Sequence, residues 1–150
     1  MDKDYVPIED LQSFAIDFIK NAGAAALDAH VARRAAEAGL DLTFLRTIPG
    51  TIGGAVRMNA GGHGSDTAEW LIEATLIDAD TGETDVADAA ALDLSYRHSR
   101  VLSNEIVTCA RFRTYEQAQE EGERLMRDIT GWRRRHQPGG TFNAGSVFKN

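Results

Sequence analysis

The sequence predicts an α+β fold, and three observations support this prediction. Segments with helical and strand-like patterns both occur, but they do not alternate regularly along the chain. A glycine-rich stretch separates the first clear helix pattern from the strands that follow. A hairpin pattern then precedes a further strand and a long helix. A doubly wound parallel sheet requires regular alternation of strand and helix, so this order favours an α+β arrangement.

Length and composition are those of a soluble globular chain. The 150 residues make one ordinary domain or a piece of a larger one. Hydrophobic residues contribute 43% and charged residues 26%, and no apolar run approaches the roughly 20 residues that cross a bilayer. The acidic, polar start is no secretory signal, and the single Cys109 excludes an internal disulfide. We therefore expect a cytoplasmic protein that does not contact membranes.

The charge distribution argues against general nucleic-acid binding. The formal net charge is −7, whereas binding of this kind depends on a basic surface. Arginines nevertheless crowd one segment, at Arg124, Arg127, Arg133, Arg134 and Arg135. Such a cluster could hold a small anion. However, arginines near the C-terminal end of a helix more often face water and interact favourably with the helix dipole. From charge alone, the second interpretation is favoured.

Two helical patterns precede the glycine-rich stretch. Residues 7–20 carry apolar side chains at helical spacing, which indicates a short helix or an irregular leader. Residues 1–22 are therefore assigned to a leader whose role is open. From residue 25 the apolar stripe is clearer, and Gly39 fits the position just after a helix. We expect a helix over residues 25–39.

The stretch LTFLRTIPGTIGGAVRMNAGGHGSD holds six glycines within fifteen residues. This density is too high for a regular helix or strand, and the stretch is too apolar for a flexible linker. It matches neither the GxGxxG dinucleotide pattern nor the GxxxxGK pattern of phosphate-binding loops. Glycines still let a backbone approach a ligand and present N–H groups to an anion, and Thr51 adds a hydroxyl. A pyrophosphate site and a packing turn are equally compatible with the spacing.

The remainder predicts a hairpin, a strand and a helix. The hairpin consists of residues 71–78 and a return that begins at residues 84–86. Asp88 is placed to cap a short helix that ends at Leu92. A loop, a strand and a long helix follow, at residues 94–105, 106–112 and 115–135.

Three segments, in order, resemble one enzyme family. They are FLRTIPGTIGGAVRMNAGGHG, YRHS and RRRHQPGGTFNAGSVFKN. Together they resemble the UDP-N-acetylenolpyruvoylglucosamine reductases, the MurB family, from about Gly23 to Asn150. The resemblance implies a cytoplasmic flavoenzyme of peptidoglycan precursor synthesis. With bound FAD and NADPH, such an enzyme reduces UDP-N-acetylglucosamine enolpyruvate to UDP-N-acetylmuramate.

The resemblance also implies a domain arrangement. Residues 23–138 correspond to the second part of a FAD-binding domain of the vanillyl-alcohol-oxidase type, and residues 139–150 to the start of a substrate-binding domain. The family's upstream Gly-Ser-Asn phosphate loop and its active-site glutamate are not found in this sequence. We therefore expect an incomplete, inactive portion that self-associates or is completed by another polypeptide. The alternative is a non-catalytic module of this fold that binds FAD or a nucleotide, or self-associates.

Individual residues take roles from the resemblance. Arg97 and Ser146 are the implied catalytic residues, and Tyr96, Lys149 and Asn150 are implied substrate-binding residues. His63 is expected to pack or to contact the flavin edge. No metal site is implied. The implied FAD-binding residues are Pro49, Gly50, Thr51, Ile52, Gly53, Gly54, Asn59, Ala60, Gly61, Gly64 and Arg133.

The implied chemistry accounts for the two catalytic residue types. Hydride addition to an enol ether leaves negative charge that spreads onto the neighbouring carboxylate, and a fixed guanidinium such as that of Arg97 stabilises it. A serine hydroxyl is a weak acid, so Ser146 can protonate carbon only if it is held close. Taken singly, Arg97 is a surface arginine and Ser146 a turn serine. In one chain with the glycine-rich stretch, the functional interpretation is preferred.

Overall fold

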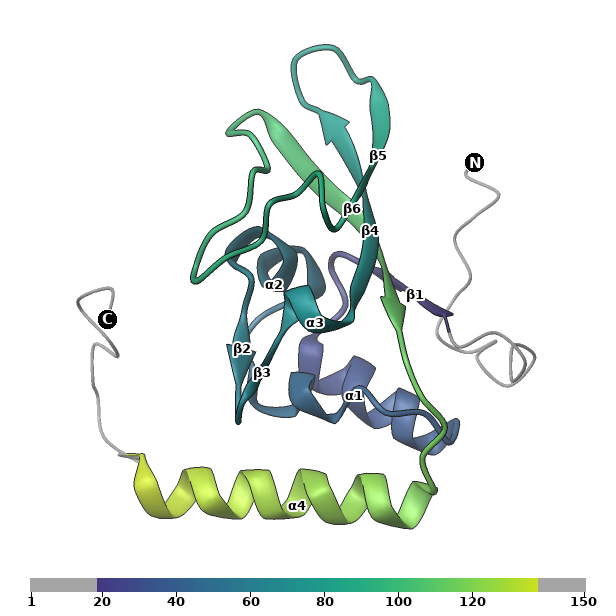
Figure 1. Cartoon of the computed structure of the whole chain (residues 1–150), viewed down its shortest axis with the longest axis vertical. Coiled ribbons are helices and arrows are strands. Elements are labelled where there is room, and N and C mark those ends of the chain that lie inside the picture. The colour runs from purple at the N-terminus through teal and green to yellow at the C-terminus, as the bar shows by residue number, and fades with distance from the viewer. Residues whose placement is uncertain (1–18, 138–150) are drawn as a thin grey trace.

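A four-stranded antiparallel sheet forms the centre of the computed structural model, which describes residues 19–137 (Figure 1). The strand order is β1-β6-β4-β5, so that β6 pairs with both β1 and β4. The strands are β1 Ile19–Gly23, β4 Leu71–Asp78, β5 Thr84–Asp88 and β6 Glu105–Arg113. With the helices around it, this sheet confirms the predicted α+β class.

Residues 19–137 also contain five helical segments. They are α1 Asp28–Glu37, the 3-10 helix η2 Thr43–Thr47, α2 Ile52–Met58, α3 Thr67–Trp70 and α4 Gln119–His136. Helix α2 packs on β6 and β1, while α4 runs along α1 and η2 (Figure 1). A short pair of strands, β2 Gly61–Gly62 and β3 Ser65–Asp66, follows α2. None of the helices in this part of the chain is long and apolar enough to cross a membrane.

The hydrophobic core joins the helices to the inner face of the sheet. Leu42, Leu45, Ile52 and Phe112 are among its most deeply buried side chains, at most 1% exposed. Burial of apolar surface stabilises a fold by about 25 cal/mol for each Å² removed from water. Such side chains are therefore the main source of stability. Because Ile52 belongs to this core, the start of α2 is fixed in position by burial.

Several predicted elements are confirmed with small shifts. The hairpin forms with β4 and β5, and Gly82 occupies a left-handed position with φ of 76° in its turn. Asp78 accepts hydrogen bonds from the N–H groups of Asp80 and Thr81 at 2.8 and 2.9 Å, which closes this turn. Helix α1 is three residues shorter than predicted at its N-terminal end, and the helix predicted from residue 115 begins instead at Gln119.

The glycine-rich stretch differs from the prediction because it contains a helix. Residues Ile52–Met58 form α2, although Gly53 and Gly54 lower its intrinsic helix propensity. Tertiary packing on β6 compensates for this propensity. The left-handed Asn59, with φ of 41°, then ends the helix. Gly53 and Gly54 therefore lie in a regular helix, which the density of glycines in the sequence did not indicate.

Two other segments also differ. Residues 19–23, predicted as the end of a leader and the start of a break, form strand β1 along the free edge of β6. Backbone pairing prevails there over a weak helical pattern. Asp88 accepts a hydrogen bond from the Ala91 N–H at 2.7 Å as a cap does, but the residues that follow form turns and not a helix. Residues 1–18 and 138–150 lie outside the described part, and with them most of the leader and the predicted start of the substrate-binding domain.

Candidate functional site

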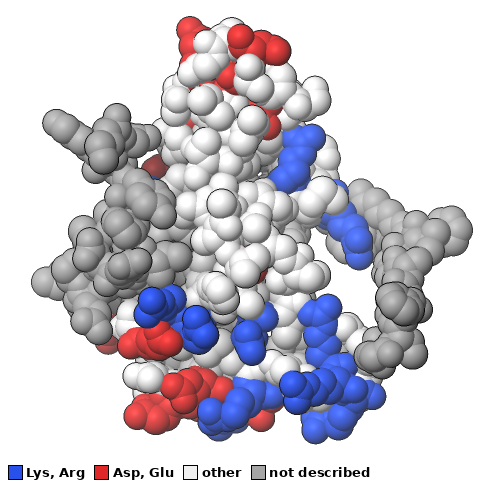
Figure 2. Space-filling model, turned by 180° about the vertical axis from the view of Figure 1, so that it is seen from behind, with Lys and Arg blue, Asp and Glu red and all other residues white. Residues whose placement is uncertain are grey.

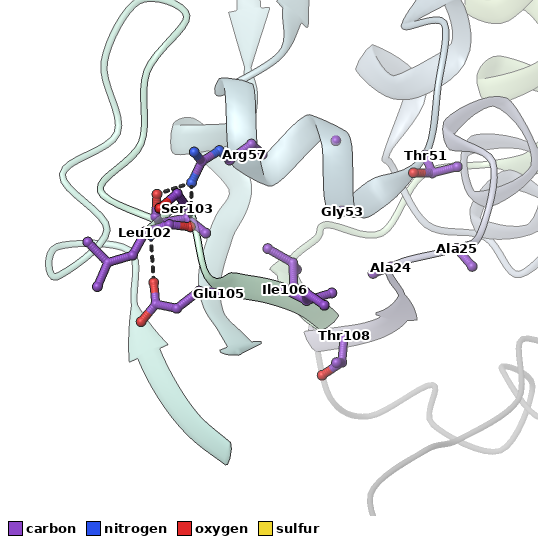
Figure 3. Close-up of a pocket in the computed structure, with 13 residues that line it drawn as sticks. Ala24, Ala25, Thr51, Gly53, Arg57, Leu102, Ser103, Glu105, Ile106 and Thr108 are labelled. Carbon is purple, nitrogen blue, oxygen red and sulfur yellow. Dashed lines mark hydrogen bonds between the residues drawn. The ribbon is translucent and has the colours of Figure 1, made fainter. Parts of the chain in front are cut away.

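A cleft of about 700 Å³ lies beside the start of α2 (Figure 3). Its walls are the turn at residues 24–25, helix α2 with the residue before it, and most of the segment 101–108 that leads into β6. Thr51, Gly53 and Gly54 line this cleft. Three of the residues assigned to FAD binding are thus brought together on one wall.

Backbone hydrogen bonds hold the start of α2 against the turn that follows β1. The Ile52 N–H donates to the Ala26 carbonyl at 3.0 Å, and the Gly53 N–H donates to the Ala24 carbonyl at 2.9 Å. These bonds satisfy donors that the first turn of a helix otherwise leaves free. A Cβ on Gly53 would lie 3.0 Å from the Cβ of Ala24. Glycine at this position therefore permits the close packing that shapes the cleft wall.

Thr51 supplies a polar group to the same wall. It is the N-cap of α2, yet its side chain makes no capping hydrogen bond. A threonine at this position commonly uses its hydroxyl to accept from the helix backbone. Here the residue lines the cleft instead, where its hydroxyl can donate to an anionic group.

Arg57 fixes the opposite end of the cleft. Its guanidinium donates to the Val101 carbonyl and, at 3.1 Å, to the Leu102 carbonyl (Figure 3). The Ser99 hydroxyl donates to the Arg57 carbonyl at 2.7 Å, and the Glu105 carboxylate accepts from the Leu102 N–H at 2.7 Å. These contacts attach the loop before β6 to α2. Sequence reasoning missed Arg57, because nothing in a helical arginine shows that its partner lies 44 residues away.

Asp28 is a buried carboxyl directly behind the glycine-rich stretch. It is 0% exposed, and among residues 19–137 neither carboxyl oxygen has a hydrogen-bond partner. Burial raises its pKa from 3.8 to about 7. The start of α1 favours an anion by roughly 0.3–1 kcal/mol, but desolvation of an unpaired carboxylate costs several times more. The sequence analysis gave this residue no role, although a carboxyl inside the apolar stretch AAALDAHVA was a visible signal.

Asn59 connects the glycine-rich stretch to two other segments. Its side chain is buried, and its amide N–H₂ donates to the Asp66 carboxylate at 3.1 Å and to the Ser95 carbonyl at 3.2 Å. Its amide oxygen accepts from the Ala68 N–H at 2.8 Å. This predicted FAD-binding side chain therefore already binds three protein groups and holds the loop that carries the YRHS motif.

Tyr96 and Arg97 occupy the tip of a tight turn. Ser95 and His98 close this turn with two backbone hydrogen bonds of 3.1 and 3.0 Å. Arg97 has a left-handed φ of 52°, which costs a non-glycine residue roughly 1–2 kcal/mol. Its Nε donates to the Tyr96 hydroxyl at 3.3 Å. The turn thus presents a predicted catalytic and a predicted substrate-binding residue together at the surface.

Arg133 reaches the first part of the glycine-rich stretch, ahead of its glycines. Its guanidinium donates to the Thr47 carbonyl, and its Nε donates to the Gln137 side-chain oxygen at 2.5 Å. Thr47 is the last residue of η2 and precedes Pro49 and Gly50 by a short connection. This predicted FAD-binding residue is therefore placed at the first part of the stretch and not in the cleft.

The other arginines of α4 have the surface roles that charge alone favoured. Arg124 and Arg127 form exposed ion pairs with acidic residues one turn away on the same helix. Arg134 and Arg135 are exposed in its last turn, where they complement the helix dipole. Figure 2 shows positive side chains gathered around this end of the molecule and acidic ones over the β4–β5 hairpin.

An aromatic contact links α4 to the β2–β3 hairpin. The His63 ring meets the Trp132 ring edge-on at 5.2 Å between centroids, and Trp132 stacks on His136 at 4.5 Å. Trp132 is 45% exposed, as expected of a rim residue. His63 therefore has the packing contact that was predicted as one of its two roles.

Comparisons with known proteins point to a flavin-binding family. The family model described as "FAD binding domain" matches residues 14–87. A protein of Roseobacter denitrificans named UDP-N-acetylenolpyruvoylglucosamine reductase is 52% identical over 129 residues, which are 86% of this chain and 41% of that protein. Its namesake in Paracoccus denitrificans is 51% identical over 86% of this chain and 42% of its own length.

A solved structure carries the same name. The crystal structure of UDP-N-acetylenolpyruvylglucosamine reductase (MurB) from Thermus caldophilus matches with a TM-score of 0.72 and 32% sequence identity. The match covers 86% of this chain and 47% of that one. The chain belongs to the MurB family. It spans about two-fifths of the length of the curated relatives.

Among the described residues, the remaining predicted ones do not line the cleft, and their surroundings differ. Pro49 and Gly50 are exposed next to Thr51, whereas Ile52 is fully buried and can offer a ligand only its backbone. Gly61 is a packing glycine, because a Cβ there would lie 2.5 Å from the Ser65 carbonyl oxygen. Ala60 and Gly64 flank the same hairpin. Ser146, Lys149 and Asn150 lie outside the described residues, so their roles stay predictions, as do those of the other site residues.

Proposed function

We propose that the described residues form one wall of the FAD site of a flavin-dependent reductase. Its reaction is the NADPH-dependent reduction of UDP-N-acetylglucosamine enolpyruvate to UDP-N-acetylmuramate, in peptidoglycan precursor synthesis in the cytoplasm. Through cell-wall synthesis, this step contributes to cell shape and division. The observation that carries the proposal is the cleft at the start of α2, where three residues assigned to FAD binding line one wall. The relatives are named as reductases of UDP-N-acetylenolpyruvoylglucosamine, which supplies the substrate and the type of reaction.

The residues of the cleft suit a dinucleotide diphosphate. Gly53 and Gly54 keep side chains away from the wall, so that a ligand can approach the backbone. Thr51 offers a hydroxyl that the helix does not use. Arg57 adds positive charge at the other end, although its N–H groups already bind two carbonyls. These residues would hold the diphosphate, and the turn at residues 24–25 would close the cleft behind it.

The tight turn at Tyr96 and Arg97 supports a role on the substrate side. The chemistry that FAD would supply here is hydride transfer between NADPH and the enolpyruvyl group. Arg97 would bind the carboxylate of that group through parallel hydrogen bonds and stabilise the charge that develops there. The strained backbone of a surface arginine is of the kind found at functional sites. Ser146 would then deliver a proton to carbon.

Titration of the whole chain with FAD tests the first part of this proposal. Binding is followed by quenching of flavin fluorescence and by the flavin absorbance between about 350 and 500 nm. We expect Thr51→Val to weaken FAD binding by about ten-fold, because one hydrogen bond to a charged group is lost. Thr84→Val is the matched control, since Thr84 is exposed on β5 and lines no part of the cleft.

Two results would contradict the proposal. One is the absence of any spectral change or quenching when FAD is added to the folded chain. The other is an equal effect of Thr51→Val and Thr84→Val on the FAD dissociation constant, because the cleft would then have no special part in binding.

A further inference from the structure

Asp28 has a position that neither the core nor the surface explains. It begins α1, and its carboxyl is 0% exposed. Both carboxyl oxygens lack a hydrogen-bond partner among the described residues. Buried carboxyls are ordinarily hydrogen-bonded or paired, so an unpartnered one requires an explanation.

The carboxyl lies against the loop that forms the edge of the cleft. The Asp28 N–H donates to the Gly50 carbonyl at 3.1 Å, and the preceding Leu27 pairs with Thr51 in an antiparallel bridge. The Oδ2 atom of Asp28 is 3.8 Å from the position that a Cβ on Gly50 would take. Since Thr51 lines the cleft, the buried carboxyl and the ligand side of the loop are separated by one layer of backbone.

Among the described residues, no neighbouring charge pairs with this carboxyl. The elements around it are α1 itself, η2 and α4, which pack on α1, and the segments 24–27 and 49–51, the second of which leads into α2. Besides Asp28 itself, the charged or titratable side chains of α1, η2 and α2 are His30, Arg33, Arg34, Glu37, Arg46 and Arg57, and those of α4 are Glu120, Glu121, Glu123, Arg124, Arg127, Asp128, Arg133, Arg134, Arg135 and His136. Within the described part of the chain, none of these forms an ion pair or hydrogen bond with Asp28. Burial alone raises its pKa, to about 7.

We propose that Asp28 is a positioning residue of the FAD site, whose neutral carboxylic acid supports the Gly50–Thr51 loop and whose ionisation weakens binding of the diphosphate. This inference rests on the proposed function of the cleft. The neutral acid fits behind the loop at little electrostatic cost, whereas a carboxylate would place a negative charge within one backbone layer of an anionic ligand. Binding and proton release therefore oppose one another, and by linkage the ligand also makes the proton harder to remove.

The test measures FAD affinity of the whole chain at about pH 6 and about pH 8.5, on either side of the Asp28 titration. The diphosphate of FAD stays ionised throughout this range. We expect the dissociation constant of the wild type to rise at least roughly five-fold at the higher pH. Asp28→Asn, which keeps the shape of the neutral acid, should bind FAD with similar affinity at both. Asp85→Asn, an exposed residue of β5, is the matched control and should keep the wild-type dependence.

Riboflavin binding and the pH dependence of FAD binding distinguish a failure of this inference from a failure of the proposed function. Riboflavin lacks the diphosphate, so its binding should not depend on Asp28. A pH dependence of FAD binding that persists in Asp28→Asn would overturn the inference and leave the FAD proposal intact. Absence of FAD binding at either pH would instead overturn the proposed function, and with it the role of Asp28 toward the diphosphate.

A measurement on the wild type covers the case in which Asp28→Asn does not fold. Carbon-13 labelling of the aspartate carboxyls allows each to be titrated by NMR. One carboxyl should titrate near pH 7 in the unliganded chain and at higher pH with FAD bound. A chain whose aspartates all titrate below about pH 5, or in which FAD moves none of them, contradicts the proposal.

Discussion

Arg133 donates a hydrogen bond to the carbonyl of Thr47, and this contact joins the last turn of α4 to the end of η2, in the first part of the glycine-rich stretch. Replacing Arg133 by Gln should lower the free energy of unfolding by about 1–2 kcal/mol, since a charge-assisted hydrogen bond to a partly buried carbonyl is lost. Urea unfolding of the two proteins measures the difference. Arg134→Gln, on the exposed side of the same turn, should change stability by less than about 0.5 kcal/mol. Equal effects of the two substitutions would show that the contact with Thr47 is unimportant.

The two adjacent glycines of α2 should respond in opposite directions to alanine. A Cβ at Gly53 would lie 3.0 Å from the Ala24 Cβ and 3.4 Å from its carbonyl oxygen, whereas at Gly54 the nearest atom is 4.0 Å away. We expect Gly54→Ala to stabilise the chain by about 0.5–1 kcal/mol, as alanine does in an open helix position. Gly53→Ala should instead destabilise it by about 1–3 kcal/mol through overpacking. Thermal unfolding of both variants decides this, and a gain in stability from both would contradict the tight contact.

Arg97 should be replaceable with a gain in stability. Its φ of 52° suits glycine far better than a side chain with a Cβ. Arg97→Gly is therefore expected to raise the free energy of unfolding by about 1 kcal/mol. Arg97→Lys keeps the strain and should leave stability unchanged within about 0.3 kcal/mol. If Arg97→Gly is instead less stable than Arg97→Lys, the arginine is held by contacts that outweigh the backbone strain.

The pH dependence of stability should reveal the buried acid. The pKa of Asp28 rises from 3.8 in the unfolded chain to about 7 in the folded one, so the folded state holds the proton more tightly. Its contribution to stability is then fully present below about pH 3.8 and is lost as the pH rises to about 7. At 1.36 kcal/mol for each pKa unit, the loss is at most roughly 4 kcal/mol. Asp28→Asn should remove this dependence. The free energy of unfolding of Asp28→Asn minus that of the wild type should therefore increase between about pH 3.8 and about pH 7 and then stay constant. Denaturant unfolding at a series of pH values measures it, and a constant difference between the two proteins would contradict the assignment.

The isolated 150-residue chain is expected to bind FAD without turnover. This chain spans about two-fifths of the length of the relatives named for the proposed reaction, and the Arg97 turn alone cannot complete it. NADPH oxidation that depends on the enolpyruvyl substrate is the measurement, with FAD supplied in excess. Substrate-dependent oxidation by this chain would contradict the expectation, whereas FAD binding without oxidation is also what the alternative of a non-catalytic module predicts. If mixing with a complementary polypeptide restores oxidation, the chain is an incomplete portion of the enzyme and not a non-catalytic module.

The parts of the fold set by local pattern were predictable from the sequence. The alternation in Leu71–Asp78 and the turn residues after it specify the hairpin without reference to the rest of the chain. Strand β1 was not predictable in this way, because its strand conformation depends on the free edge of β6, far away in sequence. Helix α2 was missed for a related reason, since its glycines are compensated by packing that only the folded chain provides.

The candidate site shows the same division. The glycine-rich stretch and the YRHS motif could be chosen by resemblance, and the structure places Thr51, Gly53 and Gly54 on one cleft wall. Arg57 could not be chosen, because its importance comes from two distant carbonyls. Asp28 was visible only as a carboxyl in an apolar stretch, and its lack of a partner in the described structure is seen only in the folded chain. Contacts between segments distant in sequence carry this information, and a single sequence does not display them.

The three hydrogen bonds of the Asn59 amide have a mechanical consequence. One of them spans 36 residues to the Ser95 carbonyl, so the tip carrying Tyr96 and Arg97 cannot swing outward unless that bond breaks. Since Asn59 ends α2, this bond connects the turn of Tyr96 and Arg97 to the end of that helix. The glycine-rich stretch and the YRHS motif, which are separate in the sequence, are thus coupled in the folded chain.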